Sequence, residues 1–90
     1  MLDLRRLQTF QVVAGTRSFT RAAAQLGYRQ SSVTMQIQAL ERELGVFLFE
    51  RRQYSNSVIL TEDGRQALEH VSRLLALAEE TKAAAAGNTR

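Results

Sequence analysis

The stretch SFTRAAAQLGYRQSSVTMQIQALEREL, residues 18–44, decides the fold of this chain. It divides at Leu26-Gly27-Tyr28 into two segments, each with apolar residues at the spacing of one helical face. Gly27 suits this break, because a residue without a Cβ can adopt the left-handed conformation that closes many helices. The sequence therefore predicts two short amphipathic helices joined by a tight turn.

The second of these helices, residues 30 to 44, divides into an apolar side and a polar side. The apolar side, at i, i+4, i+7 and i+11, is expected to enter the core and holds Val33, Ile37, Leu40 and Leu44, with Gly45 ending the helix. The opposite side holds Ser31, Met35, Gln38 and Arg42, with Thr34 beside them. Such amides and hydroxyls can hydrogen-bond base edges and phosphates, and this face is free of acids. An ordinary solvated face is the alternative, but behind a glycine turn the pattern favours a helix-turn-helix that reads DNA.

Two helical segments precede the turn. Apolar residues at helical spacing predict a support helix from residue 3 to about 14, ended by Gly15, and they are Leu4, Leu7, Phe10 and Val13 or Ala14. Ser18 is suited to cap the next helix. Its apolar stripe consists mostly of small residues that allow close packing: Phe19, Ala22, Ala23 and Leu26.

After Gly45 the pattern changes to short runs of strand-forming residues. Residues 47–51 and 58–60 are such runs, and the polar segment between them contains turn formers. We interpret them as a two-stranded β hairpin, or wing. A loop with two apolar anchors is the alternative.

The last segment predicts a long helix from Glu62 to about Ala86, capped by Thr61 and followed by a frayed tail, residues 87–90. At ~1.5 Å per residue it approaches 40 Å, which is too long for so small a domain to cover. We expect its apolar stripe to pair with the same helix of a second copy. The stripe consists of Leu68, Val71, Leu74, Leu75 and Ala78.

Composition agrees with one small, mainly α domain: the chain has 90 residues, 44% of them hydrophobic, and no proline. Without cysteine, neither a disulfide nor a thiolate metal site can form. There is no signal-peptide pattern and no run of membrane-spanning length, so we expect a cytoplasmic protein without a membrane partner. Residues 1–60 hold eight Arg against four acids. This suits phosphate binding, although an Arg-rich composition can equally reflect a GC-rich genome.

Catalytic patterns are missing from the sequence. His70 is the sole histidine, and the five glycines do not cluster as a nucleotide loop. For His70, a surface or interface role is a simpler interpretation than metal binding. We therefore expect a protein that is not an enzyme and needs no cofactor and no metal.

Five blocks in their order and spacing resemble the N-terminal DNA-binding domain of LysR-type transcriptional regulators. They are LRRLQTF (4–10), SFTRAAAQLG (18–27), QSSVTMQIQALERELGV (30–46), LFER (48–51) and LTEDG (60–64). The resemblance covers residues 2 to about 82. It implies a winged helix-turn-helix, with a three-helix core and a two-stranded β wing over residues 1–60, followed by a linker helix over 61–86. It also implies that two chains pair antiparallel through this helix and read a pseudo-palindromic double-stranded DNA operator.

The resemblance also assigns site residues. Gln30 matches a base-contacting position, Ser31, Thr34 and Gln38 match positions that contact bases or phosphates, Thr20 resembles a phosphate contact, and Arg52 lies in the wing. The whole predicted DNA-binding set is Thr20, Arg29, Gln30, Ser31, Ser32, Thr34, Met35, Gln38 and Arg52. Arg51 can instead be structural, held by Glu50 or Glu43.

Two positions and one segment depart from the family pattern. Arg29 stands where relatives commonly carry a capping serine, and a cation there is unfavourable at a helix N-terminus unless a phosphate lies close. Met35 replaces a frequent arginine or polar group and can touch a thymine methyl instead. The wing is longer than usual and its tip, residues 54–57, is not basic, which leaves its DNA contact open.

A second function remains possible from the sequence: a non-catalytic interaction module that forms mixed dimers with a full-length relative. Family members continue into an effector-binding domain, on which ligand response and higher oligomers depend. We expect a truncated chain, with a natural short protein as the alternative.

Overall fold

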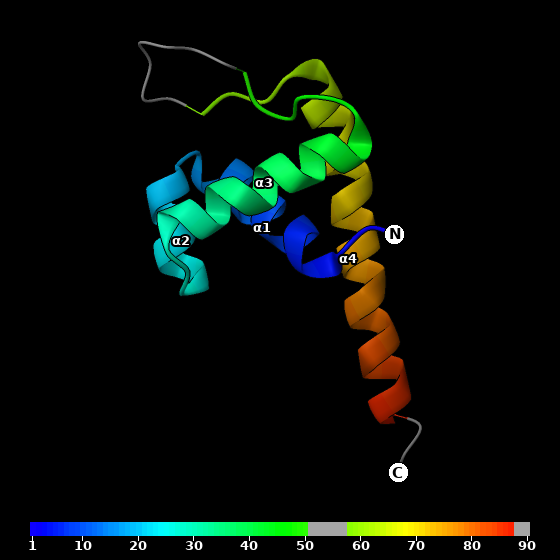
Figure 1. Cartoon of the computed structure of the whole chain (residues 1–90). Helices are drawn as coiled ribbons and strands as arrows, with labels where there is room; N and C mark the ends of the chain where they lie inside the picture. The colour runs from blue at the N-terminus through cyan, green and yellow to red at the C-terminus, as the bar shows by residue number, and fades with distance from the viewer. Residues whose placement is uncertain (51–57, 88–90) are drawn as a thin grey trace.

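The computed structural model describes residues 1–50 and 58–87. Within these residues the chain forms α1 (Leu4–Thr16), α2 (Phe19–Leu26), α3 (Gln30–Leu44) and α4 (Glu62–Gly87). The first three helices pack into one body, while α4 lies against α1 and continues well beyond it (Figure 1). The predicted mainly α fold with a helix-turn-helix is confirmed.

Local capping interactions fix most helix ends where the sequence predicted them. The Ser18 hydroxyl accepts the Arg21 N–H at 3.0 Å and so caps α2. Gly27 and Gly45 both have φ of +75° and close α2 and α3 in the left-handed conformation. At α4, the Thr61 hydroxyl accepts the Gly64 N–H at 2.9 Å. These four predictions are confirmed.

The end of α1 differs from the prediction. Gly15 does not terminate the helix, which continues to Thr16 and ends at Arg17, whose φ is +55°. The Arg17 N–H donates to Val13 O at 2.8 Å, and the Ser18 N–H donates to the Thr16 hydroxyl at 3.3 Å. Glycine permits a helix end without requiring one, so the hydrogen bonds around Thr16 place the turn instead.

The core lies where α1, α2 and α3 meet the chain after Gly45. Phe10 packs edge-to-face on Phe49 with ring centroids 5.6 Å apart, and Phe19 packs on the same ring at 5.9 Å. A polar link crosses the core, because the buried Thr9 hydroxyl donates to Gln36 Oε1 at 2.6 Å and so ties α1 to α3. The buried apolar residues are Leu7, Phe10, Val13, Ala22, Ala23, Val33, Ile37, Leu40, Leu48, Phe49 and Val71.

The predicted core stripe of α3 is wrong at its last member. Val33, Ile37 and Leu40 are buried, but Leu44 is 37% exposed. Glu41 is buried in the last turns of α3 instead, and its carboxylate accepts the Leu48 N–H at 2.8 Å. The chain reverses at Gly45 directly after Leu44, and the returning backbone offers a donor, which a carboxylate satisfies and a leucine does not.

The two runs predicted as wing strands pair over residues 48–50 and 59–61. Phe49 and Leu60 form one antiparallel bridge, and the flanking bonds run from Glu50 N to Ile59 O (2.8 Å) and from Thr61 N to Leu48 O (3.0 Å). Residues 51–57, with the wing tip and both Arg51 and Arg52, lie outside the described residues. The two-stranded wing therefore stays a prediction.

α4 contributes to the core of its own chain through part of the apolar stripe that the sequence assigned to a partner copy. Val71 is only 6% exposed, and Leu68 and Leu75 pack partly against the core. The Gln11 amide of α1 also donates to the Ser72 hydroxyl at 3.4 Å. Gly87, predicted to lie in the tail, is the last residue of the helix. The sequence period could not show that α1 covers one side of this stripe.

Candidate nucleic-acid interface

Helix α3 presents its predicted polar side to solvent. It packs with its opposite side on α1 and α2 and lies across the surface of the body (Figure 1). Of the predicted residues between 29 and 38, Ser32 and Thr34 are half-buried at the margins, and the others are exposed: Arg29, Gln30, Ser31, Met35 and Gln38. The seven residues predicted between 29 and 38 thus lie on one accessible surface, which we call the α3 face.

Met35 stands at the centre of the α3 face and is 68% exposed. The hydroxyls and amides around it offer donors and acceptors, whereas its thioether side chain offers an apolar contact. A single exposed methionine is common on protein surfaces, so exposure alone is not evidence of binding. Its position among polar groups gives the α3 face one apolar point suited to a thymine methyl.

The start of α3 is open to an anion. Arg29 occupies the N-cap position with extended backbone, and its side chain makes no capping hydrogen bond. Its carbonyl accepts the N–H groups of Ser32 and Val33, at 3.0 and 3.2 Å. The first turn of α3 contains no acidic residue. The positive end of the helix dipole and the Arg29 guanidinium therefore act together, an arrangement suited to a phosphate group.

Thr20 is hydrogen-bonded to the first residue of α3. It is the second residue of α2, and its hydroxyl donates to Oε1 of Gln30 at 3.1 Å. The two side chains are both exposed and connect α2 to the first residue of α3. The sequence singled out both residues but not the bond between them.

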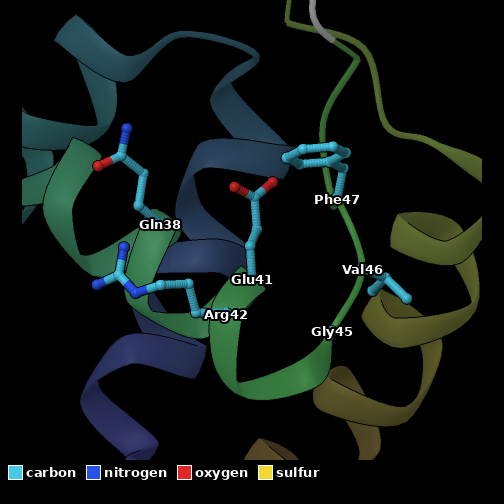
Figure 2. Close-up of a pocket in the computed structure, with 6 residues that line it drawn as sticks. All are labelled: Gln38, Glu41, Arg42, Gly45, Val46 and Phe47. Atoms are coloured by element: carbon cyan, nitrogen blue, oxygen red, sulfur yellow. The ribbon is translucent and has the colours of Figure 1, made fainter.

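The C-terminal half of the α3 face borders two hollows. One, of about 550 Å³, is lined by Gln38, Glu41, Arg42, Gly45, Val46 and Phe47. Figure 2 shows Gln38 and Arg42 extending from α3, with Glu41 directed toward the segment that carries Phe47. The second hollow, of about 620 Å³, lies between α3 and Arg6 of α1.

Arg6 is a candidate that the sequence analysis missed. It lines the second hollow together with Ser32, Met35, Gln36, Gln38, Ala39 and Arg42, so a second helix brings a cation to the α3 face. The Arg5-Arg6 pair was visible in the sequence. Which of the two approaches α3 depends on how α1 is rotated in the core, and the period of α1 alone does not specify its neighbour.

The remaining sequence expectations concern Arg52, His70, metal ligands and membrane-spanning helices. Arg52 lies outside the described residues. His70 is exposed, and its Nδ1 lies 3.0 Å from Gln66 O in the same helix. Across residues 1–50 and 58–87, no group of three potential ligands is arranged to hold a metal ion. Within the same ranges, no helix is both long and apolar enough to span a membrane.

An exposed polar helix that follows a glycine turn and a supporting helix defines the helix-turn-helix class. Residues 4–65 match the family described as "Bacterial regulatory helix-turn-helix protein, lysR family". The chain belongs to this family.

Relatives support the assignment along nearly the whole chain. The HTH-type transcriptional regulator YwqM of Bacillus subtilis is 43% identical over 83 residues, which is 92% of this chain and 28% of that protein. The RuBisCO operon transcriptional regulator of Allochromatium vinosum is 45% identical over 74 residues, 82% of this chain and 24% of that protein. The chain thus spans about a quarter of the length of these relatives.

Solved structures of similar chains share the fold. The protein in the CbnR_DBD-DNA complex is 35% identical with a TM-score of 0.90, covering 99% of this chain and 100% of that one. The protein in the BenM_DBD/benA site 1 DNA complex is 33% identical with a TM-score of 0.92, covering 98% and 100%. Both are similar to this chain from end to end, and both were solved with DNA.

Proposed function

We propose that this chain binds double-stranded DNA sequence-specifically, as the DNA-binding domain of a LysR-type transcriptional regulator acting in the cytoplasm. The observation that carries the proposal is the α3 face, where exposed amides, hydroxyls and Met35 form one surface behind a tight turn. The helix would lie in the major groove, whose base edges offer donors, acceptors and thymine methyls. The similar chains in complex with DNA support the same assignment.

Affinity would come mainly from cations around the α3 face. Arg29 at the start of α3, Arg42 near its end and Arg6 from α1 lie along this surface. Each guanidinium can form forked hydrogen bonds to phosphate oxygens. Phosphate contacts hold the protein in register, while Gln30, Gln38 and Met35 would provide the sequence-dependent contacts.

The experiment that tests this function is binding-site selection from a pool of random DNA duplexes, followed by titration of a selected and a scrambled duplex. We expect a defined site, and a logarithm of the association constant that falls linearly with the logarithm of salt concentration, by about 0.9 per phosphate contact. Fluorescence anisotropy at several salt concentrations measures both. A flat salt dependence, or equal affinity for the two duplexes, would contradict the proposal.

We further propose that α4 pairs two copies, so that two α3 helices read a pseudo-palindromic operator. Leu74 and Leu77 remain 40% and 61% exposed after α4 has packed on α1. Beside them, Leu4, Leu75 and Ala78 line a hollow of about 500 Å³ between α1 and α4. Covering these groups with a second copy would remove apolar surface from water.

Charged substitution of the exposed apolar residues should separate the copies. We expect Leu74→Glu combined with Leu77→Glu to give a monomer in sedimentation equilibrium, because a partner helix would have to bury two carboxylates. Val71→Glu is unsuitable, since Val71 belongs to the core of its own chain. Ala76→Glu, exposed on the other side of α4, is the matched control and should leave a dimer. If the double variant keeps the mass of a dimer, the assigned surface is wrong.

A further inference from the structure

We infer that Thr20 is a specificity-determining residue that orients the amide of Gln30, so that Gln30 selects a keto base, guanine or thymine, over adenine or cytosine. The inference rests on the proposed function, because it concerns the base that the α3 face reads. Its basis is the hydrogen bond from the Thr20 hydroxyl to Gln30 Oε1. A phosphate role for Thr20, which the family resemblance implies, is the competing assignment.

Both partners of this bond stand on fixed backbone. Thr20 lies in the first turn of α2, which the Ser18 side chain caps at the Arg21 N–H. Gln30 is the first residue of α3, reached through Gly27, where the Tyr28 N–H also donates to Ala23 O at 2.9 Å. The turn thus holds the two Cα positions. Only the side-chain torsions remain adjustable, and the 3.1 Å bond constrains those of Gln30.

The bond decides which half of the Gln30 amide is offered to DNA. An amide is planar, and its oxygen and nitrogen lie on opposite branches of Cδ. Because Oε1 is directed at Thr20 on α2, the NH₂ group is the branch that points away from α2. Gln30 therefore directs its two N–H donors away from α2, while its oxygen is turned toward α2.

Donors and acceptors on the base edges then discriminate. A glutamine with both groups free pairs with adenine, accepting from N6 and donating to N7. With Oε1 turned toward Thr20, the NH₂ group pairs best with base edges rich in acceptors. Guanine offers O6 and N7 and thymine offers O4, whereas adenine offers N7 alone beside its N6 donor and cytosine offers no acceptor. The exocyclic amines of adenine and cytosine carry donors and would face the NH₂ group of Gln30. The expected result is a preference for a keto base at the position that Gln30 contacts.

Thr20 cannot contact a phosphate and orient Gln30 at the same time. A threonine hydroxyl carries one proton, so it cannot donate to a phosphate oxygen and to Gln30 Oε1 at once. A phosphate contact adds affinity for every sequence equally, whereas an oriented glutamine changes the preference for one base pair. The two roles therefore produce different binding profiles.

The test uses the 90-residue chain and a pool of random DNA duplexes, with Thr20→Val as the variant and Thr20→Ser as its matched control. Valine keeps the branched shape and loses the donor, while serine keeps the donor; the exposed position makes both tolerable for the fold, which circular dichroism checks. The base pair read by Gln30 is the one whose preference disappears in Gln30→Ala. At that base pair we expect wild type and Thr20→Ser to prefer a keto base. For Thr20→Val we expect the ratio of the affinity for a keto base to the affinity for adenine to fall by about tenfold.

Four outcomes would overturn the inference. One is an unchanged base profile for Thr20→Val. Another is an equal loss of affinity for all sequences with a shallower salt slope, which would assign Thr20 to a phosphate. A wild-type preference for adenine at the Gln30 position is a third. A wild-type chain that selects no site would overturn the proposed function as well, so the two failures are distinguishable.

Discussion

Replacing Gly64 with alanine should lower the free energy of unfolding by about 1–3 kcal/mol, against the usual benefit of alanine in a helix. Gly64 is buried in the first turn of α4, beneath the chain that leaves α3. A Cβ built there would lie 2.1 Å from Leu48 O and 3.1 Å from a methyl carbon of Leu60. The nearest atom belongs to backbone and cannot rotate away.

Two effects of opposite sign compete at this position. Alanine gains about 0.5–1 kcal/mol over glycine from helix propensity. Relieving the clash requires α4 to move away from Leu48, whose carbonyl accepts the Thr61 N–H at 3.0 Å. Overpacking of this kind costs about 1–3 kcal/mol, and a lost backbone hydrogen bond adds about 1 kcal/mol. The cost exceeds the gain.

The chain contains a matched control. Gly15 is also helical, but it is exposed and nothing lies within 4 Å of its Cβ position. Gly15→Ala should therefore raise stability by about 0.5–1 kcal/mol through propensity alone. Urea unfolding followed by far-UV circular dichroism measures both variants. If Gly64→Ala were as stable as Gly15→Ala, the close approach of α4 to Leu48 would be wrong.

The second large effect is expected from truncating the α3 face. Gln30→Ala combined with Met35→Ala should weaken binding to the selected duplex by about 2–4 kcal/mol, roughly 30- to 1000-fold. Both side chains are exposed, so their removal leaves the core unchanged. Binding to a scrambled duplex should change little, because the surrounding arginines remain.

Fluorescence anisotropy with the selected and the scrambled duplex separates these effects. Gln25→Ala, an exposed glutamine of α2 outside the α3 face, is the control and should bind like the wild type. A double variant that retains full affinity for the selected duplex would show that α3 does not read the bases. The chain would then have to be considered as a dimerisation module alone.

The sequence was sufficient wherever a feature depends on neighbours along the chain. Ser18 and Thr61 cap their helices, and Gly27 and Gly45 close theirs, because each such interaction spans only a few residues. The polar side of α3 was also predictable, since a helix of known period with one apolar stripe must expose the other. Arg29, Gln30, Ser31, Met35 and Gln38 are therefore exposed, and their contact with DNA stays a prediction.

Features that depend on a neighbouring element were predicted less well. The sequence assigned Leu44 to the core. The structure buries Glu41 in the last turns of α3 instead, where its carboxylate accepts the N–H of Leu48. The sequence assigned Val71 to a partner, but α1 and the rest of the body bury it. The sequence also missed the position of Arg6 beside the α3 face and the bond from Thr20 to Gln30. Each brings together residues of different helices.

The sequence by itself determined the order of the helices, most of their ends and the side of α3 that is free to bind. Hydrogen bonds and apolar spacing within one helix are local, so residue types at fixed separations specify them. Only the tertiary structure decided which surfaces remain exposed after packing and which side chains from separate helices meet. Those outcomes depend on the rotation and distance between helices, which the packing of the whole core sets.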